Sequence, residues 1–361
     1  YKDALIDFNK AISLNPNSSE LYVNRAEVKF AIDEYSKEAI ADLDMAISLN
    51  PSDPKPYIIK ARDGFFDLKF SKIMSLFDKA ISLDGQNFEA YYEKAFYIFT
   101  IHDLLGFELF TEEFGGLETF KYSGRESDFF DIGIEAISKA LELRPENKIM
   151  SKLFFIKGKL IENKKDYLEN DTDYDSVISN YVRCIDINNK SYDCNYGLGY
   201  IKWILEEYDS SIRYFDKYFE LFDDLEYQEK QDVIKDGGHA DASFYLANIY
   251  GHKENYEKAI EILDRGIEIN PLSETLYHWR GMAKGFIGDS FGNLSDHKRA
   301  FELDNTNTTY MDNVAGAMMD LELYNDAIEY FEKIIEIDST DYLSYSRIGY
   351  IYTYELENHN K

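Results

Sequence analysis

The chain has 361 residues, of which 68 are acidic and 39 basic, giving a formal net charge of −29. This charge would repel nucleic acid and anionic membranes, so it argues against both as main ligands and favours a basic or neutral protein partner. It also keeps a large surface soluble, so it identifies no partner by itself. No apolar run reaches the roughly 18–20 residues that a membrane span needs, and membrane insertion is not expected.

The chain begins with a stretch that recurs along its whole length. Tyr1–Pro16 predicts a short amphipathic helix that ends at a proline, and a clearer version spans Asn255–Pro271. In that version Tyr256, Ala259, Ile260 and Leu263 follow the i, i+3, i+4, i+7 spacing of a helix packed on one side. Proline ends each helix because it has no N–H to donate. Further copies occupy Glu38–Pro51, Ile134–Pro145 and, more weakly, Tyr324–Ser339.

The ends of these helices mark a period. They fall at Pro16, Pro51, Gly85, Pro145, Asn189, Asp223, Pro271, Asn305 and Ser339, at intervals of 35, 34, 60, 44, 34, 48, 34 and 34 residues. A period of 34 with three insertions predicts a solenoid of helix pairs. We expect about eight full repeats and a half repeat at each end, Tyr1–Pro16 and about 342–355, in a single domain over residues 1–361. The missing partner helix before Tyr1 suggests a fragment of a longer chain.

Three insertions interrupt the period, at about 101–128, 164–175 and 224–239. The first includes the strongly apolar segment Gly106–Arg125, which either folds back on the repeats as a short helix or hairpin or forms part of a ligand surface. The third insertion predicts an added helix followed by a turn. The second holds Asp171, Asp173 and Asp175, which begin like a calcium loop, but the required glycine and bidentate glutamate are absent, so an acidic turn before a helix is favoured.

Residues at fixed places in the helix pairs resemble those of the tetratricopeptide repeat family over nearly the whole chain. First helices carry a large residue and then a small one, and second helices carry small, large, small and proline. These positions are Tyr22 and Ala26, Tyr57 and Ala61, Tyr91 and Ala95, Leu246 and Ala247, Tyr277 and Gly281, then Ala4, Phe8, Ala11, Pro16, and Ala39, Leu43, Ala46, Pro51. The resemblance implies an all-α, right-handed superhelix of antiparallel helix pairs.

In the resembled family the first helices line a concave groove that binds protein or peptide. Carried onto this chain, the groove positions give the candidate site residues Lys55, Arg62, Tyr92, Phe96, Phe99, Tyr196, Tyr200, Trp203, Phe244 and Asn248. The spacing of Tyr196, Tyr200 and Trp203 places all three on one face of a helix, so they are the strongest candidates. The alternative is that these aromatic residues only pack between neighbouring first helices.

No constellation of residues typical of an enzyme stands out. The string G-D-S-F-G at Gly288–Gly292 superficially suggests a serine hydrolase, but it falls at a predicted helix–helix turn rather than after a strand. Cys184 and Cys194 form no metal motif, and we interpret them as buried free thiols in a reducing compartment, with a disulfide across the turn as the alternative. Neither a cofactor nor a metal is expected.

These patterns together predict a non-enzymatic scaffold that binds a protein or peptide on its first helices. Two alternatives are a regulatory or substrate-recruiting arm of a larger enzyme and a structural module that self-associates through its uncapped ends. A cytoplasmic location is expected, although an N-terminal signal removed before Tyr1 would not be visible in this sequence.

Overall fold

The computed structural model describes residues 1–361 except 34–35, 64–69, 114–128, 169–173 and 357–361, and it also leaves out the side chains of 102–113 and 165–168. The described chain is helical without strands, and it divides into two compact units, Tyr1–Cys194 (unit 1) and Asn195–Lys361 (unit 2). The predicted all-α fold of repeated helix pairs is confirmed. A single continuous domain over the whole chain stays a prediction.

Unit 1 contains nine helices in its described residues and the start of a tenth. They are α1 (Lys2–Leu14), α2 (Ser19–Ile32), α3 (Lys37–Leu49), α4 (Lys55–Asp63), α5 (Phe70–Leu83), α6 (Phe88–Glu113), α7 (Phe129–Glu142), α8 (Asn147–Leu168), α9 (Tyr174–Ile187) and α10 (Tyr192–Ile204). The first insertion begins as an extension of α6 and the second as an extension of α8. Most of the Gly106–Arg125 segment lies outside the described residues, as do Asp171 and Asp173, so the predictions made for them stay predictions.

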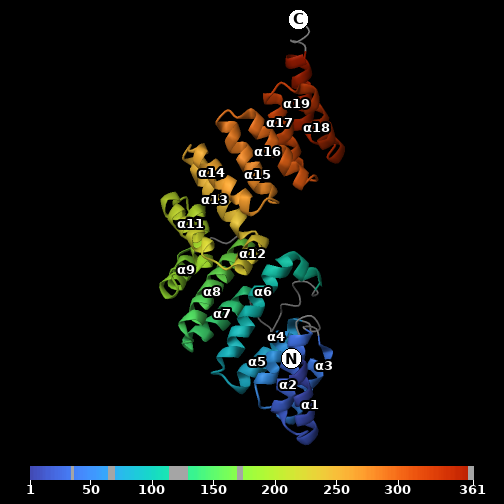
Figure 1. Ribbon diagram of the computed structural model, residues 1–361, viewed down its shortest axis with the longest axis vertical. Helices are drawn as coiled ribbons and strands as arrows, with labels where there is room; N and C mark the ends of the chain where they lie inside the picture. The colour runs from blue at the N-terminus through green and yellow to red at the C-terminus, as the bar shows by residue number, and fades with distance from the viewer. Residues whose placement is uncertain (34–35, 64–69, 114–128, 169–173, 357–361) are drawn as a thin grey trace. The chain divides into compact units, whose positions relative to one another are not determined.

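Unit 2 takes the remainder of α10 and continues to the end of the described chain. Its helices are α11 (Tyr208–Asp223), α12 (Tyr227–Lys235), α13 (Gly238–His252), α14 (Tyr256–Ile269), α15 (Glu274–Phe286), α16 (Ser290–Leu303), α17 (Thr308–Asp320), α18 (Tyr324–Ile337) and α19 (Tyr342–Tyr350), followed by a π-helical turn at Ile351–Leu356. In Figure 1 each helix from α13 to α18 lies beside the next one in the chain. Helix α12 is the added helix predicted for the third insertion.

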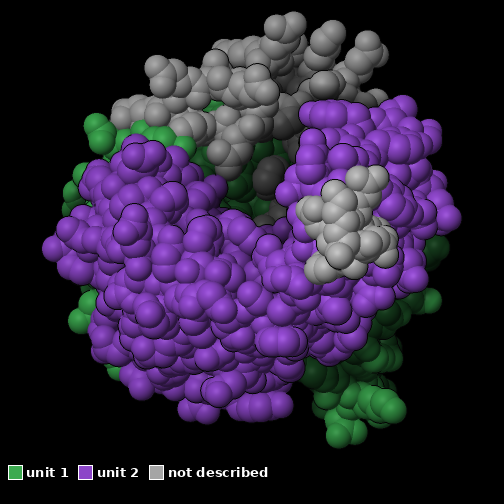
Figure 2. All heavy atoms as spheres, turned by 90° about the horizontal axis from the view of Figure 1, so that it is seen from above, with its two compact units in different colours: residues 1–194 green, residues 195–361 purple. Residues whose placement is uncertain are grey.

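The two helices of a repeat have different neighbours. First helices contact each other across repeats, α2 with α4, α4 with α6, α6 with α8, and α13 with α15. Second helices in the described ranges make no contacts of comparable extent with one another. Elements on the inner side of a bent stack are closer together than those on the outer side, so the first helices lie on the inner side within each unit. Figure 2 shows that the surface of unit 2, in purple, curves around a hollow.

The turn from first to second helix is repeated four times with the same backbone geometry in unit 2. In each turn one residue has a positive φ, and the following amide donates a hydrogen bond of 2.9 Å to the carbonyl five residues earlier. The residues with positive φ are Glu206, Glu254, Gly288 and Glu322. This arrangement closes the end of a helix. The G-D-S-F-G string therefore lies in a helix–helix turn, as predicted, and the Asp289 carboxylate accepts a hydrogen bond from the Gly292 amide at the start of α16.

Polar pairs join four of the first helices, α2, α4, α6 and α15, to the second helix of the preceding repeat. A basic side chain on the first helix donates to a carboxylate or amide oxygen sixteen residues earlier. The pairs are Arg25 with Asn9, Lys60 with Asp44, Lys94 with Asp78, and Arg280 with Asp264. Repetition of one contact at one spacing fixes how successive repeats stack, which is the interaction that solenoid stability depends on.

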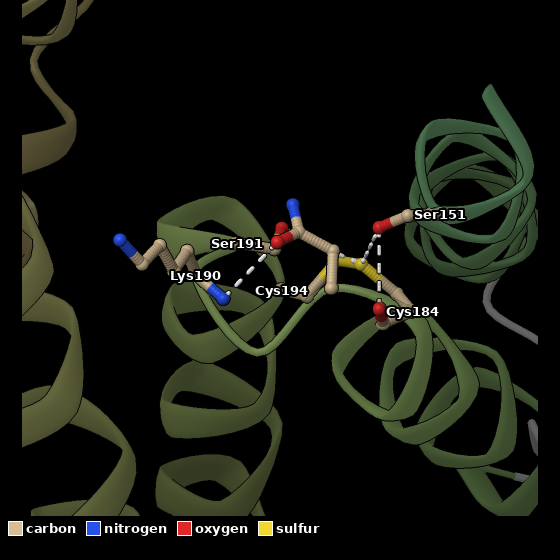
Figure 3. Close-up of a disulfide and its surroundings, with 6 residues drawn as sticks. Ser151, Cys184, Lys190, Ser191 and Cys194 are labelled. Carbon is tan, nitrogen blue, oxygen red and sulfur yellow. Dashed lines mark hydrogen bonds between the residues drawn. A yellow bond between two sulfur atoms is a disulfide. The ribbon is translucent and has the colours of Figure 1, made fainter. Parts of the chain in front are cut away.

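The interpretation of the two cysteines as free thiols was wrong. Cys184, near the end of α9, and Cys194, in the first turn of α10, form a disulfide, and both side chains are fully buried (Figure 3). Their Cα atoms are 6.4 Å apart, which is within the reach of a disulfide. The Ser151 hydroxyl of α8 donates to the Cys184 carbonyl oxygen at 3.2 Å, so a third helix is tied to the same point. The turn between a second helix and the next first helix brings the two thiols together.

Candidate functional site

First helices of unit 1 surround a hollow of about 260 Å³. It lies between Arg62 of α4, Lys152 of α8 and the residues Tyr92, Glu93, Phe96, Tyr97 and Thr100 of α6. Three successive repeats contribute, and every lining residue comes from a first helix. Three of the predicted site residues, Arg62, Tyr92 and Phe96, are therefore brought together at one place on the structure.

A row of aromatic rings forms one wall of this hollow. The rings of Tyr92 and Phe96 are 5.9 Å apart and nearly parallel, and Phe99 continues the row at 6.4 Å from Phe96. Spacings of three and four residues place these rings on one face of α6. The Lys152 ammonium lies 4.7 Å from the centre of the Phe96 ring, a favourable cation–π distance. The wall therefore offers aromatic surface to an apolar group, while Lys152 already occupies its cation–π position.

Charged groups at the rim of this hollow are only partly compensated. The Arg62 guanidinium donates two 2.8 Å hydrogen bonds to Asp63, which raises its pKa, and lies 3.9 Å from a Glu89 oxygen. Burial raises the pKa of Glu93, and the nearby Arg62 opposes that rise. Lys55, also predicted to face the groove, instead forms an exposed 3.0 Å ion pair with Glu27 of α2 and does not line the hollow.

The other predicted aromatic residues lie in unit 2, where they separate into two sets. Tyr196 packs against second helix α11, with its ring 6.2 Å from Phe215 and 5.8 Å from Tyr218. Tyr200 and Trp203 instead meet residues of the next first helix, α13. We call the second set the Trp203 cluster, and its members are Tyr200, Trp203, Phe244, Tyr245 and Trp279.

Contacts within the Trp203 cluster are extensive. The Trp203 ring lies 4.7 Å from Tyr245, and its Nε1 donates a 2.9 Å hydrogen bond to the Asn248 Oδ1. Phe244 lies 4.9 Å from Trp279 of α15. The cluster thus joins three successive first helices, α10, α13 and α15. Its rings pack the helices together and are also partly exposed to solvent. Truncating Tyr200 or Trp203 would damage the fold together with any binding function.

A second hollow, which we call the Trp279 pocket, adjoins this cluster. It has a volume of about 280 Å³, and its surface is mostly apolar. Asn248 and Trp279 connect it to the Trp203 cluster, Gly251 forms part of its floor, and Tyr256 and Phe286 stack at 4.7 Å to form a wall. Phe286 remains 63% exposed, so this wall is accessible from solvent. Large apolar pockets with a few polar groups are typical ligand sites.

Sequence reasoning found only one side of the Trp279 pocket. Asn248 is one of the residues predicted to face the groove, and Gly251 lies one turn further along the same first helix. Met282, which is 34 residues after Asn248 in the next repeat, also lines the pocket. Tyr256 was predicted only as part of the packed stripe of its helix, and Phe286 was not predicted to face the groove. Both residues flank turns, and their stacking depends on how neighbouring repeats pack.

No site for a metal or membrane is found in the described structure. The described residues contain no group of three or more His, Cys, Asp or Glu side chains suited to a metal ion. None of the helices in the described ranges is long and apolar enough to span a membrane.

Comparison with known proteins identifies the repeats. The family model described as tetratricopeptide repeat matches residues 240–271 and 313–341. The C-terminal part of a TPR repeat-containing protein from Cytophaga hutchinsonii is similar in structure at 14% identity, covering 82% of this chain and 99% of that one, with a TM-score of 0.56. No curated protein matches the sequence.

Two further solved structures are similar with lower scores. One is YrrB, described as a TPR protein with an unusual peptide-binding site; the match covers 59% of this chain and 97% of YrrB, with 19% identity and a TM-score of 0.46. The other is the Cut9–Hcn1 hetero-tetramer of the APC/C, which covers 88% of this chain and 52% of its own, with 13% identity and a TM-score of 0.49.

Proposed function

Because this chain is a tetratricopeptide repeat protein, we propose that it is a non-enzymatic scaffold that binds a protein or peptide segment along its first helices. The observation that carries this proposal is the Trp279 pocket. It is apolar, open to solvent and lined by first helices α13 and α15 together with second helix α14. Partly exposed aromatic walls of this kind provide the few anchoring contacts that dominate protein binding.

The partner is neutral or basic, since a net charge of −29 disfavours an acidic one. The enzyme-arm and self-association alternatives stay predictions. The cytoplasmic location also stays a prediction, but one of its supports has been lost. Buried free thiols would have favoured a reducing compartment, whereas disulfides persist mainly in oxidising ones.

Filling the Trp279 pocket tests this proposal without disturbing the core. A Cβ added to Gly251 meets no atom within 4 Å, so Gly251→Leu places its side chain in the open pocket. Leucine also favours a helix more than glycine does, so the variant should fold. We expect a partner captured from a native lysate of the source organism to be lost by Gly251→Leu, as measured by affinity capture with mass spectrometry.

The matched control is Gly349→Leu. A Cβ added to Gly349 of α19 also meets no atom within 4 Å. Gly349 is exposed and lies outside the pocket. This variant should retain the same proteins as the parent chain. If Gly251→Leu, with an unchanged circular dichroism spectrum and melting temperature, captures the same proteins as the parent, the Trp279 pocket is not the binding site.

A further inference from the structure

Another hollow, more polar than the Trp279 pocket, shares lining residues with it. We call it the Asp312 pocket; it has a volume of about 370 Å³ and shares Met282 and Phe286 with its neighbour. Its remaining lining residues are Gly285 of α15 and residues of α16, α17 and α19. A ligand lying across Phe286 would therefore meet a mostly apolar surface on one side and a surface with charged and polar groups on the other.

Two buried polar atoms in the Asp312 pocket have no hydrogen-bond partner. They are the Asn293 Oδ1 and the Nδ1 of His297, whose side chain is only 2% exposed. Burial lowers the pKa of His297 to about 4, so its ring is neutral at pH 7 and does not repel a cation. Buried polar groups are normally paired, because an unpaired one loses its hydrogen bonds to water without replacing them. The Asn293 oxygen calls for a hydrogen-bond donor.

The charges of the pocket favour a cationic donor. Asp312 pairs with Arg347 at 2.7 Å, while the exposed Asp320 makes no ion pair within the described part of the chain. Two carboxylates thus face one guanidinium. Between residues 308 and 356 the sequence has no other basic residue than Lys333 and Arg347, and Lys333 lies over the Tyr330 ring of second helix α18.

A guanidinium group matches these acceptors better than other cations do. It presents five N–H donors in a plane, so it can donate to an amide oxygen and pair with a carboxylate at the same time. A metal ion is less suitable, because no group of three or more candidate ligands occurs among the described residues. An anion would be repelled by Asp312 and Asp320. The adjoining Trp279 pocket is apolar, so it would accommodate an apolar side chain next to the cation.

We propose that the two pockets together bind a peptide segment in which an apolar side chain stands next to an arginine, with the apolar side chain in the Trp279 pocket and the guanidinium in the Asp312 pocket. There the guanidinium donates to the Asn293 Oδ1 and pairs with Asp320. This inference rests on the proposed scaffold function and specifies the chemistry of its ligand.

Matched peptides test the arginine half of this proposal. The probes are fluorescein-labelled glycine–serine peptides that carry Leu-Arg or Arg-Leu at their centre, and the same peptides with citrulline in place of arginine. Citrulline keeps the shape of arginine but has no charge. In fluorescence anisotropy titrations of the full chain, we expect at least one arginine peptide to bind about tenfold or more tightly than its citrulline counterpart, since charge-assisted hydrogen bonds are the strong ones.

Variants of the chain test whether the arginine binds in the Asp312 pocket and the apolar side chain in the Trp279 pocket. Gly316 lines the Asp312 pocket, and a Cβ there meets no atom within 4 Å, so Gly316→Leu fills this pocket without a clash. This variant and Asp320→Asn should lose the preference for arginine over citrulline. Gly251→Leu should lose the preference for a leucine peptide over its alanine counterpart. Gly349→Leu should keep both preferences.

Equal affinities for the arginine and citrulline peptides would overturn the inference, as would binding that Gly316→Leu leaves unchanged. Absence of measurable binding by both arginine peptides at millimolar protein would overturn it as well. A different result would reject the scaffold proposal: capture by Gly251→Leu of the same lysate proteins that the parent chain captures. Loss of that capture without arginine selectivity would leave the scaffold function standing and reject the arginine pocket.

Discussion

Lowering the pH from 7 to about 4 is expected to destabilise unit 2 by several kcal/mol, because two of its histidines are buried in the neutral form. His239 in α13 is fully buried and His297 in α16 is 2% exposed. Burial is the main cause that lowers the pKa of each to about 4, from an ordinary value of 6.5. As the pH falls, the unfolded chain binds a proton on each ring more readily than the folded chain does. The free energy of unfolding therefore decreases.

The surroundings of His239 offer little compensation for a positive charge. Its ring lies 4.4 Å from Phe222 and 5.3 Å from Phe219, and neither ring nitrogen has a hydrogen-bond partner. Arg265 lowers the pKa further, whereas Asp223 raises it, and these two residues are joined by a 2.5 Å ion pair. The carboxylate is thus already neutralised by the arginine.

His297 has a similar balance of neighbours. Its ring packs at 3.0–3.2 Å from the position that a Cβ on Gly281 would occupy, and it lies 5.4 Å from the His278 ring. His278 lowers the pKa of His297, and Asp296 raises it. That carboxylate is committed to Arg280 and Lys284 at 2.6 and 2.8 Å. Burial also lowers the pKa of His278 itself.

The sign of the pH effect follows from these depressed values. The unfolded chain binds a proton on each histidine near pH 6.5, whereas the folded chain does so only near pH 4, so stability is complete above pH 6.5 and falls as the pH drops toward 4. A shift of about 2.5 units at 1.36 kcal/mol per unit gives roughly 3 kcal/mol for each histidine. In unit 1, burial raises the pKa of Asp193 to about 6, which has the opposite sign and favours the folded state in acid.

Hydrogen exchange of the full chain, measured by mass spectrometry between pH 7 and 4, checks this prediction. After correction for the intrinsic exchange rate, helices of unit 2 should lose protection before those of unit 1. His239→Leu removes one titrating group from an apolar site and should move the acid transition of unit 2 to lower pH. The exposed His252 provides the control variant, His252→Gln, which should leave the transition in place. An unchanged transition in His239→Leu would refute the role of that ring.

The repeat was predictable from the sequence because it depends on local spacing. The positions of Ala259, Leu263 and Pro271 recur with a basic period of 34 residues that three insertions interrupt, and helices follow from that pattern alone. The position of a side chain relative to the next repeat does not follow from spacing. Tyr196 and Tyr200 are one turn apart, yet one contacts α11 and the other contacts α13. The rotation of each helix within the stack decides this, and many residues outside the pattern contribute to that rotation.

Pocket residues show the same division. Asn248, Met282 and Gly316 follow one another at intervals of 34 residues on successive first helices, and Gly251 lies one turn after Asn248; all four line a hollow in unit 2. The unpaired Asn293 lies on a second helix, where the family pattern predicts no ligand contact. Its side chain lies against Gly285, where a Cβ would clash with it, so its position depends on a contact between two helices of one repeat. The sequence pattern selects first-helix positions such as Asn248 that line a hollow, and it gives no signal for the unpaired oxygen of Asn293 on a second helix.

Reducing the Cys184–Cys194 disulfide is expected to destabilise unit 1 by about 3 kcal/mol. The bond restricts the unfolded chain by closing a short loop, and the entropy that this removes depends only weakly on loop length. For a unit of this size, that corresponds to a fall of roughly 6–12 °C in melting temperature. Thermal unfolding of the full chain with and without a phosphine reductant measures the difference. Because both sulfur atoms are buried, the reductant should be added before heating and left to equilibrate.

The double variant Cys184→Ala/Cys194→Ala separates the bond from the reductant, since it should melt at the lower temperature under both conditions. A parent chain whose melting temperature does not respond to complete reduction, verified by thiol labelling after unfolding, would show that the bond contributes no stability. The loss should also be local. Each repeat in a solenoid contacts only its neighbours, so α8, α9 and α10, which meet at Ser151 and the disulfide, should lose exchange protection while α2 and α3 keep theirs. A redox change at this turn therefore acts on the repeats that adjoin it.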